Sequence, residues 1–479
     1  WTALRHITVF QRHLCLHLVG AARRTCAGEV MGYPARPGAP RRTLRQGNSH
    51  LGMNVDTIKL PVRELAIGMQ VVKLDRPWLG TPFLLQGFRI SSNDELQQLA
   101  RFCSHVYVEV KSGALPAGGR GELVTLNEEG DVVETKRSVS ALSARERDSA
   151  PADAAALPRP AVNYALESTF SDELPHTRAA LTSTKLAVRD LIEVVRGGRR
   201  APLDAVKAAA AALEESMLRN PDPAMLLRAL ASDEPFSFRH CVNSTILAIS
   251  MGRALGLRRQ TIHELTMGML LADLGKLRLP KELLRADRRL DRREVEIIKL
   301  HVKFGVEIAN DLGGLTPGTL DVVASHHERF DGSGYPRGIE RGEISLLARI
   351  AGLADAFDAI TSERTYSAAI VMHEAVQELY AATVEVFQRE LVETLILVLG
   401  THPIGSLVEL ADGRVALVVA QNRERRLLPW VMVLSDTQRK PLVSRELHNL
   451  AAAGGPAVRQ VLEHGSHGFA MPGEEVLPA

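Results

Sequence analysis

Apolar and polar residues alternate along the first ordered stretch of the chain, from about residue 55 to residue 110. The segments TIKLPVREL, MQVVKLDRPW and HVYVEV alternate in the way that is typical of strands. Between them, SNDELQQLARFC has a Ser/Asn cap and acidic residues in its first turn, a pattern that predicts a short helix. This stretch therefore predicts a small α+β domain.

A helical spacing of apolar residues replaces the alternation from residue 172 onward. TRAALTSTKLAVRDLIEVVRGG ends in a glycine stop, and LDAVKAAAAALEESMLRN ends before Pro221. The helical pattern continues from 236 to about 398, with interrupting loops rich in Gly, Pro and Asp. After Gly400 come two apolar runs joined by Asp412-Gly413, a strong hairpin signal, and LPWVMVLSD predicts a third strand.

These patterns predict a mainly α protein whose helical domain follows a small α+β domain and precedes a small β-rich extension. The predicted segments are an Arg-rich leader that is disordered or spurious (1–52), a small α+β regulatory domain (53–111), a linker with a hairpin near Asn127–Asp131 (112–171), the helical domain (172–400), the β-rich extension (401–450) and a flexible tail (451–479). The leader carries eight arginines, no lysine and a single acidic residue, so a basic arm is its alternative interpretation.

The composition narrows the class of protein. The formal net charge is +2 with 24% charged residues, so whole-molecule electrostatics favour neither nucleic acid nor a membrane surface. Four dispersed cysteines (Cys15, Cys26, Cys103 and Cys241) form no CxxC pair, which indicates free thiols in a reducing compartment. No run reaches the ~18 apolar residues of a membrane span. We therefore predict a cytoplasmic protein with no membrane span.

Titratable residues gather, in order, between His240 and Asp355. They lie in FRHCVNSTILA (His240), LLADLGKLRLP (Asp273 and Lys276), IIKLHVKFG (His301), HHERFDGSGYP (His326, His327, Glu328, Asp331 and Tyr335) and AGLADAFDAITSERTY (Asp355). His240 and His301, taken alone, fit a structural role better than a ligand role. Asp273 and Asp355 each interrupt an apolar helical stretch, where an unpaired carboxylate is costly to bury. They indicate a shared buried cation, although an ion pair of Asp273 with Lys276 is an alternative.

The double histidine is harder to explain as structural. Adjacent side chains on a helix point about 100° apart, so both imidazoles reach one pocket only when it is lined from several sides. The following DGSGYP contains Gly332 and Gly334, which permit unusual backbone angles and let a ligand approach the main chain. Pro336 then stiffens the end of the loop.

The ligand types limit the metal and its chemistry. Imidazoles and carboxylates without a thiolate suit Fe, Mn, Zn or Ni. One aspartate can bridge two metal ions ~3.5–4 Å apart, an arrangement that stabilises both oxygens in phosphoester hydrolysis. Lys276 would help to hold phosphate charge. The residues themselves therefore favour a metal-dependent phosphohydrolase.

These motifs resemble the HD-GYP branch of the HD phosphohydrolase superfamily. HHERFDGSGYP, DLGKLRLP and ADAFDAITSERTY fall in the family's order and at its spacing, over about residues 236–400. The region 55–110, with LDRPWLGTPFLLQGF, resembles the small domain of unknown function that often precedes HD-GYP. THPIGSLVELADGRVALVVAQN resembles the strand-rich extension of the same group.

The resemblance implies an HD-type helical bundle that hydrolyses cyclic di-GMP to pGpG or GMP in bacterial second-messenger signalling. It implies two divalent metal ions, iron first and manganese as the alternative. The residues that it assigns are His240, Asp273 and Asp355 for one metal, His301, His326 and His327 for the other with Asp273 bridging and catalytic, Lys276 for catalysis and phosphate contact, and Gly332, Gly334, Tyr335 and Pro336 for the substrate pocket. The GYP loop, from Gly332 to Pro336, could also present a surface to signalling proteins such as diguanylate cyclases. The helical stretch 172–231 could support a homodimer.

Two positions depart from the family pattern. The family's His-Asp pair is Ala272-Asp273 here, so the first metal site lacks an imidazole. Some members carry a glutamate four residues before the first histidine, where this chain has Phe236, so we expect no third metal. The sequence thus leaves open a working phosphodiesterase, a catalytically impaired module that binds nucleotide or partner proteins as a regulator, and an HD hydrolase for another nucleotide.

Overall fold

The computed structural model describes most of the chain from residue 55 onward. The described residues are 55–76, 88–90, 93–111, 122–126, 132–136, 156–199, 202–230, 236–286, 288, 290–361, 386–423, 425–442, 445–462, 465–469, 472–474 and 477. The predicted leader (1–52) and the turn at Asn127–Asp131 lie outside them. The described residues form two compact units, one within Ala21–Asp153 and the other within Ala154–Ala479, and each is described by itself.

A six-stranded antiparallel sheet forms the N-terminal unit, with strand order β3-β2-β4-β1-β5-β6. Its elements are β1 (Val55–Pro61), the 3-10 turn η2 (Val62–Glu64), β2 (Gln70–Leu74), β3 (Phe88–Arg89), α2 (Asn93–Phe102), β4 (His105–Lys111), β5 (Glu122–Leu126) and β6 (Val132–Lys136). The alternation along β1 places Ile58 and Leu60 in the core while Lys59 stays partly exposed. The α+β prediction is confirmed.

Strands β5 and β6 lie inside the segment 112–171 that the sequence predicts as a linker. They pair with each other, and β5 pairs with β1, so this part of the segment belongs to the sheet. Their short polar runs alternate weakly, and the pairing with β1 that stabilises them is a long-range contact. The domain limits themselves remain a prediction.

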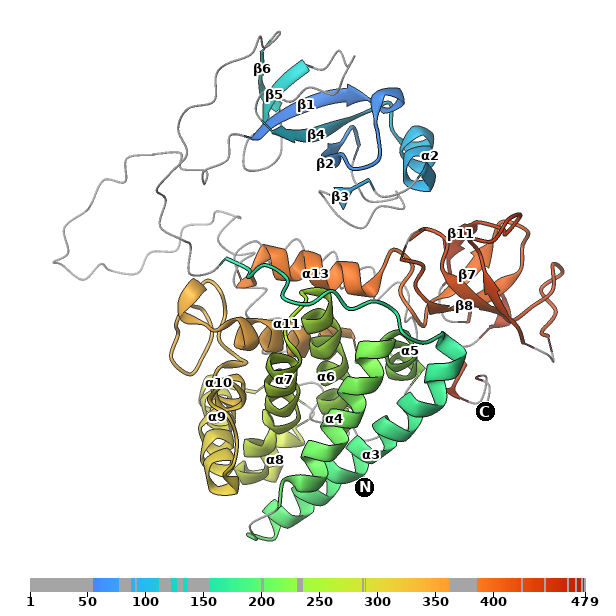
Figure 1. Ribbon diagram of the computed structural model, residues 1–479. Coiled ribbons are helices and arrows are strands. Elements are labelled where there is room, and N and C mark those ends of the chain that lie inside the picture. Colours follow the sequence, from blue (N-terminus) through green and yellow to red (C-terminus); the bar gives the residue numbers. More distant parts are fainter. Residues whose placement is uncertain are drawn as a thin grey trace. The chain divides into compact units, whose positions relative to one another are not determined.

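Helices dominate the second unit, as the sequence predicts (Figure 1). They are α3 (Phe170–Arg196), α4 (Asp204–Arg219), α5 (Asp222–Leu230), α6 (Phe236–Ala254), α7 (Arg259–Leu271), η3 (Leu274–Arg278), α8 (Lys281–Leu284), α9 (Arg292–Leu312), α10 (Pro317–Ser325), η4 (Arg341–Glu343), α11 (Leu346–Thr361) and α13 (Arg389–Leu399). Among the described residues, no helix is long and apolar enough to cross a membrane.

The helices that carry the candidate site begin and end where their sequence dictates. Asp291 caps α9 in a reciprocal capping box with Glu294, and Thr316 caps α10, whose first residue is Pro317. Helix α7 contacts α6 and α10, α9 contacts α10 and η3, and α11 contacts α6. This packing brings the C-terminal ends of α7 and α10, the N-terminal part of α6 and the middles of α9 and α11 to one place.

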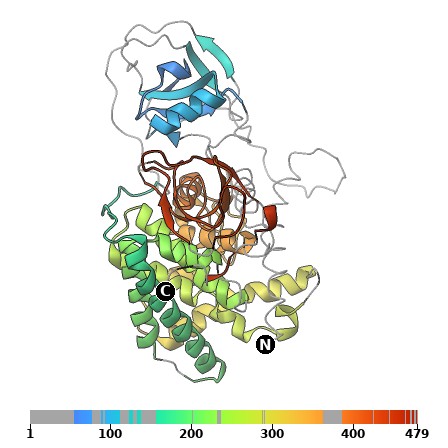
Figure 2. The same ribbon diagram turned by 90° about the vertical axis from the view of Figure 1, so that its right-hand side faces the viewer.

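The C-terminal part is a five-stranded antiparallel sheet with strand order β10-β9-β8-β7-β11, which curls strongly (Figure 2). Its strands are β7 (Leu407–Leu410), β8 (Val415–Ala420), β9 (Trp430–Val433), β10 (Leu447–Asn449) and β11 (Val458–Val461), followed by η5 (Ser466–Gly468). The predicted hairpin forms at Asp412-Gly413, where Gly413 has a φ of 89° and donates its N–H to the carbonyl oxygen of Leu410.

One strand of this sheet departs from the sequence prediction. The predicted flexible tail begins at residue 451, yet β11 pairs with β7 at the edge of the sheet. The run VRQV is too short and too polar to signal a strand alone, so its order depends on the edge that β7 offers.

Candidate metal centre

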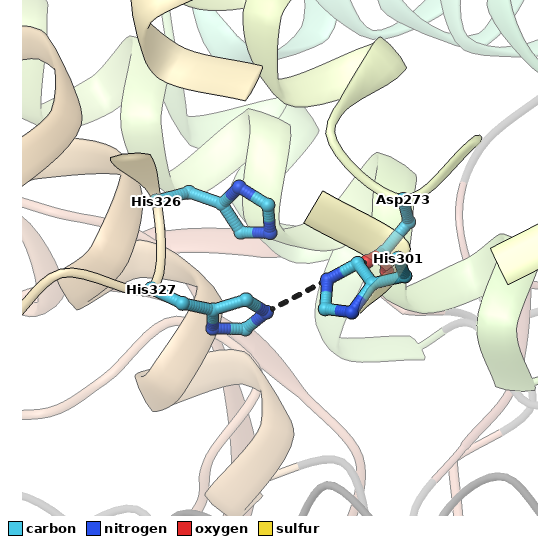
Figure 3. A group of neighbouring side chains, drawn as sticks. All are labelled: Asp273, His301, His326 and His327. Atoms are coloured by element: carbon cyan, nitrogen blue, oxygen red, sulfur yellow. Dashed lines mark hydrogen bonds and ion pairs between the residues drawn. The ribbon is translucent and has the colours of Figure 1, made fainter. Parts of the chain in front are cut away.

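Four side chains from separate elements meet in the helical domain. Asp273 follows α7 at the start of η3, His301 lies in the middle of α9, and His326 and His327 follow α10. Each offers a ligand atom, and these atoms all lie within 4.8 Å of one another. Figure 3 shows the three imidazoles and the carboxylate pointing toward a common centre.

Backbone carbonyls orient two of the imidazoles. Nδ1 of His301 lies 2.8 Å from the carbonyl oxygen of Ile298, and Nδ1 of His326 lies 3.1 Å from that of Val323. Because a carbonyl oxygen only accepts hydrogen bonds, each Nδ1 carries a proton and each Nε2 keeps its lone pair. Histidine ligands of metals are commonly oriented in this way.

Several buried acceptors of the cluster have no donor. In the part of the chain that the structure describes, Oδ1 of Asp273, Nε2 of His326 and Nδ1 of His327 have no hydrogen-bond partner. Nε2 of His327 lies 3.1 Å from Nε2 of His301. Buried polar atoms are nearly always satisfied, and a divalent cation would satisfy these together. The four residues therefore fit a metal ion.

The electrostatics keep the donors in their metal-binding forms. Burial, with Lys276 nearby, lowers the pKa of His301 to about 3. Burial also lowers the pKa values of His326 and His327. Burial would raise the pKa of Asp273, but the positive charge of Lys276 and the nearby histidines hold that pKa below its usual range. At neutral pH the cluster thus offers three neutral imidazoles and one carboxylate.

Lys276 forms an ion pair with Asp273 beside the histidines. Its Nζ donates to Oδ2 of Asp273 at 2.7 Å, while Oδ1 lies 3.8 Å from Nε2 of His301. The ion pair that the sequence offers as an alternative to a metal site therefore coexists with the cluster. It occupies one carboxylate oxygen and leaves the other facing the histidines.

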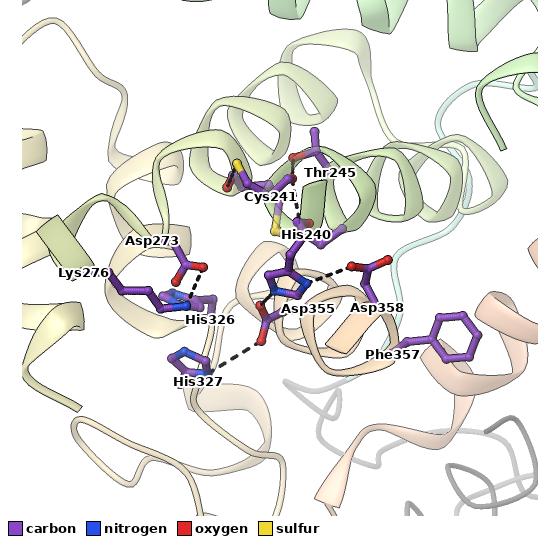
Figure 4. A network of polar contacts seen from close by, with 12 residues as sticks. His240, Cys241, Thr245, Asp273, Lys276, His326, His327, Asp355, Phe357 and Asp358 are labelled. Carbon is purple, nitrogen blue, oxygen red and sulfur yellow. Dashed lines mark hydrogen bonds and ion pairs between the residues drawn. The ribbon is translucent and has the colours of Figure 1, made fainter. Parts of the chain in front are cut away.

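The remaining two predicted ligands, His240 and Asp355, form an adjoining network (Figure 4). Nε2 of His240 lies 2.8 Å from Oδ1 of Asp355, and Nδ1 lies 2.8 Å from Oδ2 of Asp358. Oδ2 of Asp355 lies 3.9 Å from Nδ1 of His327, which joins the network to the cluster. Burial would lower the pKa of His240, but the two carboxylates raise it to about 10. In this arrangement protons satisfy both ring nitrogens of His240.

Asp358 is absent from the residues that the sequence singles out. It lies three residues after Asp355 on α11, so both carboxylates face the same side of the helix. That spacing, in an otherwise apolar helix, is the signal that identifies it. Ala272, at the end of α7, is buried with 6% exposure and offers no donor beside Asp273.

The GYP loop folds back over the histidines. Gly334 has no room for a side chain, because a Cβ atom would lie 2.4 Å from the amide nitrogen of Arg329 and 2.5 Å from the carbonyl oxygen of His327. The ring of Tyr335 stacks on that of His327 with 4.7 Å between centroids, and its amide donates to the His327 carbonyl. Gly332 and Pro336 belong to the same loop, and the role of the four predicted pocket residues toward substrate remains a prediction.

Glu328 fixes the end of the same loop through hydrogen bonds. Its buried carboxylate accepts the backbone N–H groups of Arg337 at 2.9 Å and Gly338 at 3.1 Å. Two charge-assisted hydrogen bonds to consecutive amides fix the exit of the loop. The turn formed by His326, His327 and Glu328 and the GYP loop are therefore one structural unit.

Comparison with known proteins identifies the domain that carries this centre. The profile of the HD domain family matches residues 224–391. A cyclic di-GMP phosphodiesterase of Pseudomonas aeruginosa is 29% identical over 398 residues, which are 83% of this chain and 89% of that protein. The chain carries an HD domain, and it resembles HD-GYP phosphodiesterases. A second family profile, Domain of unknown function (DUF3391), matches residues 57–206, as the sequence resemblance predicts.

Other relatives match the chain over shorter stretches. The cyclic di-GMP phosphodiesterase response regulator RpfG of Xanthomonas campestris pv. campestris is 35% identical over 144 residues, 30% of this chain and 38% of that protein. A 3'3'-cGAMP-specific phosphodiesterase of Vibrio cholerae is 36% identical over 127 residues, 26% of this chain and 24% of that protein. A solved HD-GYP-type protein from Bdellovibrio bacteriovorus is 16% identical, with a TM-score of 0.40. The alignment spans 71% of this chain and 98% of that protein.

Proposed function

We propose that this HD-domain protein is a metal-dependent phosphodiesterase of the HD-GYP type that hydrolyses cyclic di-GMP to pGpG or GMP. The cluster of Asp273, His301, His326 and His327, with its unsatisfied buried acceptors, is the observation that carries the proposal. The relative that aligns over most of the chain is named as an enzyme for this substrate. A cytoplasmic protein would meet this messenger directly.

The cluster would hold one divalent ion, iron or manganese. His240 and Asp355, with Asp273 shared, would hold a second ion. Such ions polarise phosphoryl oxygens and lower the pKa of water, which supplies the nucleophile for phosphoester hydrolysis. Because Ala272 adds no imidazole, the second ion would be bound more weakly than the first.

The other residues would bind and orient the substrate. Lys276 supplies a buried positive charge three residues from Asp273, where charge develops on the phosphoryl oxygens. Gly332, Gly334, Tyr335 and Pro336 would shape the pocket, since their loop lies directly on His327. We extend the proposal to docking of diguanylate cyclases on the GYP loop and to a homodimer through residues 172–231.

Turnover by anaerobically purified protein tests the proposal. The protein is loaded with Fe²⁺ or Mn²⁺ and supplied with cyclic di-GMP or cyclic GMP-AMP, and products are separated by chromatography. We expect pGpG from cyclic di-GMP, no product from His327→Ala, and unchanged turnover in His176→Ala, whose exposed histidine lies in the second turn of α3. Preference for cyclic GMP-AMP would redirect the substrate assignment, and turnover that survives His327→Ala would contradict the proposed centre.

Ala272 favours a second candidate function, a catalytically impaired module that binds nucleotide as a regulator. This candidate predicts that the parent binds cyclic di-GMP in calorimetry without hydrolysing it. It also predicts that Ala272→His restores turnover, because the added imidazole completes the site of His240, Asp273 and Asp355. Turnover in the parent protein would exclude it.

A further inference from the structure

Helix α5 links the C-terminal sheet to the interior of the helical domain. It contacts α3 on one side and β8 on another (Figure 1). At its first residue, the buried carboxylate of Asp222 accepts the backbone N–H of Gln421 at 3.2 Å and Nη2 of Arg423 at 3.4 Å. Both donors directly follow β8, so the sheet holds the N-terminal end of α5.

The other end of α5 is held by a close approach. Gly405, just before β7, has a φ of +90°, and a Cβ atom there would lie 2.4 Å from Cβ of Ala229. Only glycine allows the chain to pass Ala229 at this distance. The sheet segment therefore fixes α5 at both of its ends.

Arg228, the neighbour of Ala229, reaches the polar network of the candidate metal centre. Its side chain is 5% exposed, and Nη2 donates to Oδ1 of the fully buried Asp358 at 3.1 Å. The other oxygen of Asp358 lies 2.8 Å from Nδ1 of His240. A continuous polar chain thus runs from Arg228 through Asp358 and His240 to Asp355.

Arg228 supplies one of the two positive charges in this polar network. Asp355 and Asp358 place two carboxylates on one face of α11, so that His240 alone cannot balance both, and a buried carboxylate that loses a cationic partner is destabilised. Without Arg228, Asp358 would turn toward any other donor, and His240 would lose the group that orients its ring. Partners of this kind, which orient a metal-ligating histidine, typically change metal affinity when removed.

We propose that the C-terminal sheet, through α5, holds Arg228 as a positioning residue for Asp358 and His240 at the metal centre. The sheet lies beyond the matched HD domain, which ends at residue 391, and this contact gives it a role in the site. The part of the proposal that concerns metal affinity rests on the proposed function. The part that concerns the orientation of His240 does not.

Two readouts on the full chain test the role of Arg228. The first is the proton NMR signal of the imidazole Nδ1–H of His240 in metal-free protein, assigned by its loss in His240→Gln. The second is the dissociation constant for Mn²⁺, measured by electron paramagnetic resonance. We expect Arg228→Met to abolish the protected Nδ1–H signal and to weaken Mn²⁺ binding about 10–100-fold. Arg228→Lys should restore much of both.

Arg219→Met is the matched control. It also removes a guanidinium from a buried carboxylate, Glu173, but this pair joins α4 to α3 away from the centre. We expect it to lower thermal stability while leaving the His240 signal and the Mn²⁺ dissociation constant unchanged. Equal effects of Arg219→Met and Arg228→Met on both readouts would overturn the proposal.

A glycine pair tests the role of the sheet. Gly405→Ala should drive α5 away and reproduce the Arg228→Met effects in weaker form, even where Arg228→Met itself fails to fold. Gly413→Ala is its control, because Gly413 has nearly the same φ (+89°) in the same sheet but faces only the carbonyl oxygen of Thr437. A His240 signal that is unchanged in Gly405→Ala would refute the coupling. Absence of Mn²⁺ binding in the parent would instead refute the proposed function, and the His240 signal would still decide the present proposal.

Discussion

The candidate metal centre has two halves that satisfy their polar atoms in different ways. In the half formed by Asp273, His301, His326 and His327, three buried side-chain atoms have no hydrogen-bond partner among the described residues. In the half formed by His240, Asp355 and Asp358, each ring nitrogen of the histidine has a carboxylate oxygen at 2.8 Å. The first half is arranged for a cation, whereas protons already satisfy the second.

The difference follows from charge and from the missing imidazole. Lys276 neutralises Asp273 on one oxygen, which leaves three neutral histidines and one free oxygen for a metal. Asp355 and Asp358 bring two negative charges to one imidazole, which favours its protonated form. A histidine in place of Ala272 would add a neutral donor between the halves. Its absence therefore affects the half that is already protonated.

The largest expected effect separates the halves by removing one histidine from each. His326→Ala removes Nε2, which has no partner among the residues that the structure describes, so metal affinity should fall by more than the roughly 100-fold of outer-shell changes. His240→Ala should weaken binding less, because a metal there must first displace a proton. Metal content after dialysis, measured by mass spectrometry, checks both, with His176→Ala as the control. Equal losses in the two variants would remove the distinction between the halves.

Ala272→His should convert the protonated half into a second metal site. We expect the bound metal to rise from about one towards two ions per chain, the number that a bridged pair requires. Ala272→Leu fills the same buried space without a donor and controls for overpacking, which costs about 1–3 kcal/mol. A folded Ala272→His protein with unchanged metal content would show that Ala272 does not limit the site.

Gly334→Ala tests whether the first half depends on the loop that covers it. The added methyl group would meet the backbone of Arg329 and His327, so the loop must move and Tyr335 must leave the His327 ring. We expect the free energy of unfolding to fall by about 1–3 kcal/mol and turnover to fall further. Chemical denaturation and kinetics measure both. Gly197→Ala, at an uncrowded helix end, should change neither, and an active Gly334→Ala enzyme would exclude a role for the loop.

The smallest expected effect concerns a histidine–carboxylate pair outside the centre. It shows how protonation of a histidine beside a carboxylate changes the stability of the protein where no metal is involved. The hydrogen bond from His263 to Glu214, which outweighs partial burial, raises the pKa of His263. The folded state thus binds the proton more tightly, so this pair stabilises the protein fully below about pH 6.5. The contribution disappears as the pH rises through the raised pKa.

Thermal melts of the parent and of His263→Gln check this prediction. The parent should exceed the variant in Tm at about pH 6, and the difference should shrink by about pH 9. A difference that grows with pH would contradict the assigned direction of the pKa shift.

The local sequence pattern predicts most of the secondary structure of this protein. The strands that it does not predict form through pairing with strands distant in the sequence. The α+β unit, the helical domain and the hairpin at Asp412-Gly413 follow from periodicity and turn chemistry. Strands β5, β6 and β11 owe their order to neighbours distant in sequence, so their own residues carry little signal.

The candidate site shows the same division. The histidines stand out because two of them are adjacent and precede a glycine-rich loop. Asp358 could be found only from its helical spacing to Asp355, and Arg228 gives no signal at all within the apolar helix α5. The role of Arg228 becomes visible only in the folded protein, where it contacts Asp358, which is 130 residues away in the sequence.

An anomalous difference map from crystals of the manganese-loaded protein tests the central claim most directly. The account predicts a strong peak within bonding distance of Asp273, His301, His326 and His327, and a weaker peak or none between His240 and Asp355. A protein with no peak among the three histidines, or with its only peak between His240 and Asp355, would contradict it.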